Sequence, residues 1–107
     1  MFARIFTAKL KPGEGPAYAR TIDQEVIPIL RKFAGFQDEI AMVSTDGRQA
    51  IGISFWKREE DADAYSRSGY QDVLKSLEKH VDGPAVVETY DVTNSTVSAI
   101  WARKAGA

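Results

Sequence analysis

A chain of 107 residues has the size of one domain, and its 14 basic and 15 acidic residues are interspersed and leave a formal net charge of −1. Such a charge creates no field for nucleic acid or an anionic membrane, so neither partner is expected. The absence of cysteine excludes disulfides, thiolate metal sites and a thiol nucleophile. No apolar stretch approaches the ~20 residues of a membrane span, and the N-terminus lacks the pattern of a signal peptide, so we expect a cytoplasmic protein.

The first part of the chain predicts a strand followed by a helix. Residues 2–10 are rich in the aromatic and β-branched types that favour strands. A helix is expected from Pro16, which suits a first helical position. Pro28 lies inside this helix and should kink or break it locally, and Gly35 is a natural stop. The apolar face is predicted from residues that recur at spacings of three and four: Tyr18, Ile22, Val26, Ile29 and Phe33.

The middle of the chain predicts a hairpin. Residues 36–44 and 50–56 have strand patterns, and the Asp46-Gly47 pair between them is typical of a tight turn. The alternation predicts that Trp56 shares one face of the second strand with Ser54.

The last part predicts helical structure and a final strand. Residues 57–67 begin with acidic side chains, which favour the N-terminus of a helix. Ser68 and Gln71 resemble a capping box that opens a second helical stretch. Residues 85–92 predict a fourth strand, and residues 96–101 a short extended segment. The apolar stripe of the second stretch consists of Tyr70, Val73, Leu74, Leu77 and Val81.

This order of elements predicts a single α+β domain over residues 1–107. It is the ferredoxin-like, split βαβ order, with a four-stranded antiparallel sheet that carries its helices on one face. The strands are apolar on both faces, so the uncovered face should pack against a second copy in a homodimer. The C-terminal extension, residues 94–107, should contact that partner, with Trp101 buried at the interface.

Four segments taken together resemble the antibiotic biosynthesis monooxygenase (ABM) family of dimeric α/β barrels. They are KLKPG at 9–13, VIPILR at 26–31 followed by Gly35-Phe36, FWK at 55–57, and YQDVL at 70–74 leading into His80. Some members of this family oxygenate phenolic or quinol-type aromatics without flavin or metal. The resemblance therefore implies a cofactor-independent monooxygenase for a small electron-rich aromatic, needing only a dry apolar pocket, a proton acceptor and aromatic walls.

Other members degrade haem with an Asn, a Trp and a His. Phe6, Tyr65 and Glu78 stand at those positions here, so this triad is absent and haem degradation is not expected. His80 could ligate iron only if the alignment is shifted by two residues. The acidic cluster at 59–63 lacks the spacing of a metal site, and no metal or other cofactor is expected.

Three residues are candidates for the chemistry. His80, the only histidine, has an unperturbed pKa near neutrality and is the first candidate base; the other candidates are Tyr65 and Tyr70. The alternative for His80 is a structural histidine near a helix C-terminus. The alternative for the tyrosines is that they belong to the core.

Three more residues are candidates for binding the substrate. Phe6 and Trp56 could line an aromatic slot, or simply fill the core. Arg4, between apolar neighbours, could receive an acidic group of the substrate or pair with Glu88 or Asp38 across the sheet.

A rival function is a non-catalytic, small-ligand-binding or stress-related dimer. A catalytic protein should contain a continuous cavity that touches His80 and at least two aromatic side chains. A filled core would favour the rival.

Overall fold

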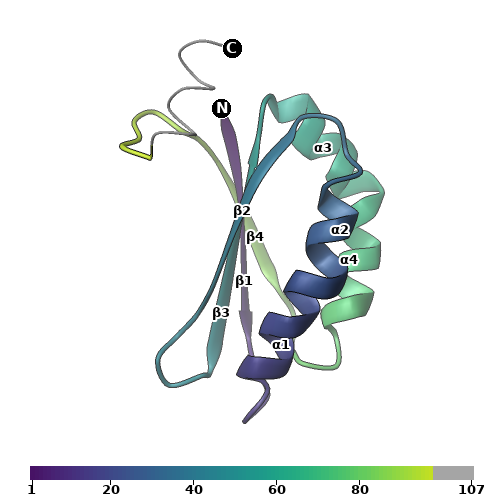
Figure 1. Ribbon diagram of the computed structural model, residues 1–107, viewed down its shortest axis with the longest axis vertical. Coiled ribbons are helices and arrows are strands. Elements are labelled where there is room, and N and C mark those ends of the chain that lie inside the picture. The colour runs from purple at the N-terminus through teal and green to yellow at the C-terminus, as the bar shows by residue number, and fades with distance from the viewer. Residues whose placement is uncertain (98–107) are drawn as a thin grey trace.

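The computed structural model, which describes residues 1–97, has two layers: an antiparallel sheet and a layer of helices on one of its faces (Figure 1). The strand order is β2-β3-β1-β4, which confirms the predicted ferredoxin-like fold. The strands are β1 (Phe2–Lys9), β2 (Phe36–Val43), β3 (Gln49–Trp56) and β4 (Val86–Asp91). The helical segments are α1 (Gly15–Thr21), η1 (Ile22–Val26), α2 (Ile27–Leu30), α3 (Glu59–Arg67) and α4 (Gly69–Leu77).

Each predicted strand is present, with ends within one residue of those expected. β1 is central and pairs with β3 from Phe2 opposite Trp56 to Lys9 opposite Gln49. Most of the predicted extended segment 96–101 lies outside the described residues, and so does Trp101. Within residues 1–97, no helix is both long and apolar enough to cross a membrane.

The first helical run stays helical past Pro28 and contains a wide π turn. Residues 15–30 are helical without an intervening loop, and the N–H of Ile27 reaches back five residues to the carbonyl of Ile22. This wide turn changes which side chains face the sheet. Leu30 is buried in place of the predicted Ile29, which is only partly buried.

The second helical layer differs from the prediction at Ser68. Its side chain makes no capping hydrogen bond to α4. The hydroxyl instead donates a hydrogen bond of 2.7 Å to the carbonyl oxygen of Ala64, which lies in the last turn of α3. This local bond competes with a capping role, as serine side chains often do.

β2 contains an irregularity that sets the face of its side chains. Phe36 stands opposite Trp56, but Asp38 is the next residue in register, opposite Phe55. The extra residue, Gln37, makes this a β-bulge, so the alternation changes phase after Phe36. Glu39 consequently stands opposite Ser54 and faces the helices.

The sheet face away from the helices is uncovered by any element of the described chain (Figure 1). It carries large apolar side chains that are about half exposed. These are Ile40 (41%), Met42 (46%), Val86 (56%) and Tyr90 (50%).

Candidate functional site

A small cavity lies between the sheet and the helices. Its volume is about 30 Å³, which is about the share of one water molecule. Four aromatic side chains line it, which satisfies part of the sequence-based criterion for a catalytic pocket. The lining consists of Arg4, Phe6, Tyr18, Ile22, Val26, Leu30, Glu39, Gly52, Ser54, Tyr65, Tyr70, Val73 and Leu77.

Glu39 is the only acidic residue that lines this cavity within the described chain. The bulge in β2 turns it inward, and Gly52 on β3 leaves room for its carboxyl group. A Cβ at residue 52 would lie 3.1 Å from Oε1 of Glu39, closer than an ordinary contact. Burial raises the pKa of Glu39 to about 8, although the charge of Arg4 acts to lower it. The carboxyl group therefore gains and loses its proton close to neutral pH.

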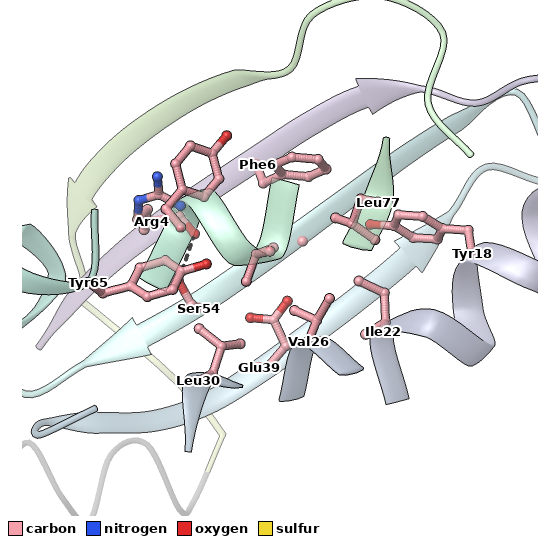
Figure 2. A pocket seen from close by; sticks show the side chains of 13 residues that line it. Arg4, Phe6, Tyr18, Ile22, Val26, Leu30, Glu39, Ser54, Tyr65 and Leu77 are labelled. Carbon is pink, nitrogen blue, oxygen red and sulfur yellow. Dashed lines mark hydrogen bonds between the residues drawn. The ribbon is translucent and has the colours of Figure 1, made fainter. Parts of the chain in front are cut away.

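Two tyrosines reach into the cavity from opposite ends, with the Glu39 carboxyl group between them (Figure 2). Burial raises the pKa of both Tyr18 and Tyr65, so their hydroxyl groups keep their protons. The Tyr18 hydroxyl has no hydrogen-bond partner among the described residues, although the side chain is fully buried. A buried donor without a partner is costly. Tyr18 is therefore ready to donate to a bound oxygen atom.

Arg4 brings a buried positive charge to the same place. Its Nε donates to the Ser66 hydroxyl at 3.0 Å. Its guanidinium carbon lies 4.0 Å from the ring centre of Tyr70 and 5.1 Å from that of Tyr65, both in cation–π range.

The two carboxylates considered as partners of Arg4 belong to the other face of the sheet. Glu88 stands opposite Ile5, and Asp38 opposite Phe55, each one residue out of step with the strand positions that face the cavity. The carboxylate that acts on Arg4 is instead that of Glu39.

His80 is buried but does not line the cavity. Its Nδ1 is 2.7 Å from Oε1 of Glu14, and its Nε2 is 2.8 Å from the hydroxyl oxygen of Thr21. The ring of Tyr18 packs edge-on against the imidazole, with centroids 6.5 Å apart. Both ring nitrogens are thus engaged, so neither is available to a substrate or to an iron atom without breaking a hydrogen bond.

Trp56 also lies behind the cavity rather than at its wall. Its indole is fully buried, stacks on Tyr65 with centroids 5.2 Å apart, and donates to the Ser54 hydroxyl at 2.9 Å. It supports two side chains that do line the cavity.

Of the six residues singled out from the sequence, the structure brings Arg4, Phe6, Tyr65 and Tyr70 together at the cavity. Sequence reasoning missed Glu39 and the role of Tyr18. Among residues 1–97, no group of three or more histidine, aspartate or glutamate side chains could hold a metal ion.

Comparisons with known proteins give likeness of structure only. No family model and no curated protein matches the sequence. Among solved structures, one similar protein is a monooxygenase from the ActVA-Orf6 gene of Streptomyces coelicolor, in complex with nanaomycin D. Its TM-score is 0.75 at 16% identity, and the match covers 90% of each chain. SnoaB, a cofactor-independent oxygenase from Streptomyces nogalater, has a TM-score of 0.69 at 10% identity, covering 90% of this chain and 96% of that one.

Two Nitrosomonas europaea proteins are also similar. One, provisionally named an antibiotic biosynthesis monooxygenase, has a TM-score of 0.71 at 17% identity, covering 88% of this chain and 100% of its own. The other, NE2512, of unknown function, has a TM-score of 0.72 at 14% identity, covering 90% of this chain and 92% of its own. The ABM resemblance is confirmed at the level of fold, and at these identities the likeness extends no further.

Proposed function

We propose that this chain is a cofactor-independent monooxygenase for a small phenolic or quinol-type aromatic, with Glu39 as the proton acceptor. The observation that carries the proposal is a partly buried carboxyl group of pKa about 8 in a cavity walled by aromatic side chains. A general base works best when its pKa is near the working pH. Two of the structural neighbours are a monooxygenase and a cofactor-independent oxygenase, which supports the reaction class.

The residues of the cavity have separate roles in this proposal. Glu39, once ionised, takes the proton of the substrate hydroxyl. The guanidinium of Arg4 stabilises the resulting phenolate, and Tyr18 donates a hydrogen bond to a ligand oxygen. Phe6, Tyr65 and Tyr70 form the aromatic wall and keep water out.

The reaction balances without a cofactor. In an anthrone-like phenol, the ring CH₂ group of the deprotonated substrate supplies four electrons to dioxygen. One oxygen atom becomes a new ring carbonyl, and the other leaves as water with the two hydrogens of that carbon. The proton held by Glu39 returns to the product or to solvent, so the carboxylate is regenerated.

Replacement of Glu39 by glutamine tests this assignment. We expect kcat/KM for anthrone-type phenols to fall by about 100- to 10,000-fold, the usual contribution of a positioned base. The raised pKa means that the active, ionised form of the wild type accumulates as pH rises through about 8. Wild-type activity should therefore rise up to that pH, and the Glu39→Gln profile should lose this step. Oxygen uptake between pH 6 and 9, corrected for uncatalysed oxidation, measures both.

Glu25→Gln is the matched control, because it makes the same chemical change at an exposed position of η1 away from the cavity. Full activity in Glu39→Gln would remove this residue from the mechanism.

One observation favours a second candidate function, a binding protein without turnover. The cavity of about 30 Å³ is too small for a ring in this conformation, since a benzene site needs about 150 Å³. Binding of phenols by the wild type without any oxygen uptake over a panel of quinols and anthrone-like phenols would establish this rival.

We also propose that the working form is a homodimer closed through the uncovered sheet face. Support comes from the half-exposed apolar side chains on the outer face of the two edge strands, β2 and β4, among them Met42, Val86 and Tyr90. Large apolar side chains exposed on a face that no element covers mark an interaction site.

A further inference from the structure

A second and larger hollow adjoins the cavity. It is a groove of about 450 Å³ between α4 and the segment of residues 81–85 that leads into β4. This volume lies within the range of about 300–1,000 Å³ that is typical of small-molecule sites. The groove is lined by Phe6, Tyr70, Leu74, Leu77, Glu78, Val81, Gly83, Pro84 and Ala85.

Three side chains line both the groove and the cavity: Phe6, Tyr70 and Leu77. They form a shared wall with the groove on one side and the Glu39 carboxyl group on the other. Phe6 and Leu77 are buried, with 7% and 2% of their surface exposed, whereas Tyr70 is only partly buried. Tyr70 is therefore the member of the wall with the most room to turn.

The backbone beneath Tyr70 is held in place. Gly69 opens α4 against the ring of Phe33, where an added Cβ would come within 2.5 Å of two ring carbons. Because the helix start fits so closely, the wall opens most easily by rotation of the Tyr70 side chain. Such a rotation gives up the cation–π contact of Tyr70 with the Arg4 guanidinium.

We propose that the groove binds the ring of the substrate and that the Phe6–Tyr70–Leu77 wall is the gate through which the substrate's hydroxyl group reaches Glu39. The inference rests on the proposed function and adds the location, size and charge of the ligand. The ring must sit in the groove because the cavity holds about one water molecule, while the groove is large enough for one or two fused rings.

The groove also selects for charge. Its lining is mostly apolar, and its only charged side chain is Glu78, an exposed carboxylate directly after α4. A negatively charged ligand would lose its hydration and be repelled by Glu78. The ligand is therefore a neutral aromatic alcohol and not an aromatic acid.

Calorimetric titration under nitrogen, with 1-naphthol and 1-naphthoic acid as probes, tests the site without turnover. Wild type should bind 1-naphthol, and 1-naphthoate at least about tenfold more weakly. Leu74→Trp narrows the groove from the α4 side and should weaken 1-naphthol binding at least about tenfold. Lys75→Trp is the matched control: it places the same side chain at the next, exposed position outside the groove and should bind like wild type.

Ala85→Phe narrows the groove from the opposite side and decides the question if Leu74→Trp does not fold. Unweakened 1-naphthol binding in a folded Leu74→Trp or Ala85→Phe variant, or equal binding of the two probes, overturns the groove assignment.

Turnover separates this inference from the proposed function. Binding with no oxygen uptake by the wild type refutes the oxygenase and leaves the groove standing. Full oxygen uptake by Leu74→Trp refutes the groove and leaves the oxygenase standing. Glu39→Gln should bind 1-naphthol within about twofold of wild type while losing turnover, as expected for a base beyond the gate.

Discussion

At the scale of single residues, the position of His80 shows how a polar side chain near a site can serve the fold. Its two hydrogen bonds join Glu14, before α1, to Thr21, at the end of that helix. His80 itself follows α4, so one imidazole ties the two helical runs together. Both ring nitrogens are thus engaged in contacts that hold the fold together.

His80→Ala should lower the free energy of unfolding by about 1–3 kcal/mol, because it leaves the buried Thr21 hydroxyl without its partner. Chemical denaturation measures this, with the exposed Lys79→Ala as the control. Oxygen uptake by the folded variant should stay within a fewfold of wild type. A loss of 100-fold or more at unchanged stability would instead return His80 to the mechanism as its base.

The residues of the site were predictable from the sequence only in part. Arg4 and Phe6 share a strand face by simple alternation, and Tyr70 belongs to the apolar stripe of α4, so their meeting could be foreseen. Glu39 could not, because the bulge at Gln37 reverses the alternation that follows Phe36. The segment after Glu39 is apolar at every position from Ile40 to Val43, so its pattern carried no sign of the reversal.

At the scale of elements, the π turn explains why the predicted helix face was partly wrong. The buried residues Tyr18, Ile22, Val26 and Leu30 are spaced by four at every step. An α-helix has about 3.6 residues per turn, so such a series would drift around it. The wider turn of η1 keeps the series on one face and excludes Ile29 from it. A spacing rule based on a regular α-helix could not show this.

The turn between α2 and β2 gives a test of how closely the elements fit. Gly35 and Gly47 both have a positive φ, +80° and +75°. An alanine at 47 meets nothing within 4 Å, whereas an alanine at 35 would overlap the carboxyl group of Asp61 on α3. Gly47→Ala should therefore cost about 1–2 kcal/mol of unfolding free energy from backbone strain alone. Gly35→Ala should cost at least about 1 kcal/mol more.

Denaturant unfolding of the two variants measures the difference directly, since each serves as the control for the other. Equal losses would mean that Asp61 moves aside freely and that α3 is not fixed by this contact.

At the scale of the whole molecule, the two faces of the sheet have different tasks. One supports the cavity, and the other presents Ile40 and Met42 on β2 to the outside. The wild type should sediment with the mass of two chains at micromolar concentration. Replacing Ile40 and Met42 together by lysine should weaken association at least about 100-fold, because charges would be buried in an apolar interface.

Ala19→Glu, at an exposed position of α1 on the opposite layer, is the control and should leave the mass unchanged. A wild-type mass equal to one chain would contradict the dimer.

The fold was predictable as a whole because the order of elements, the hairpin signal and the apolar stripes all agree on one topology. The substrate, the cytoplasmic location and the dimer contact of residues 94–107 stay predictions. They depend on a ligand, a compartment or a second chain, none of which the pattern of one chain specifies. This fold does not by itself give an activity.

The bulge in β2 has a consequence for how this site can be gained or lost in evolution. A strand has only two side-chain parities, and one inserted or deleted residue exchanges them. If Gln37 were instead paired in a regular ladder, Glu39 would stand opposite Ile53 on the outer face, and the cavity would lack its acid although no residue type had been substituted. Related chains can therefore differ in chemistry through the presence or absence of this bulge, which a comparison of residue identities alone would miss.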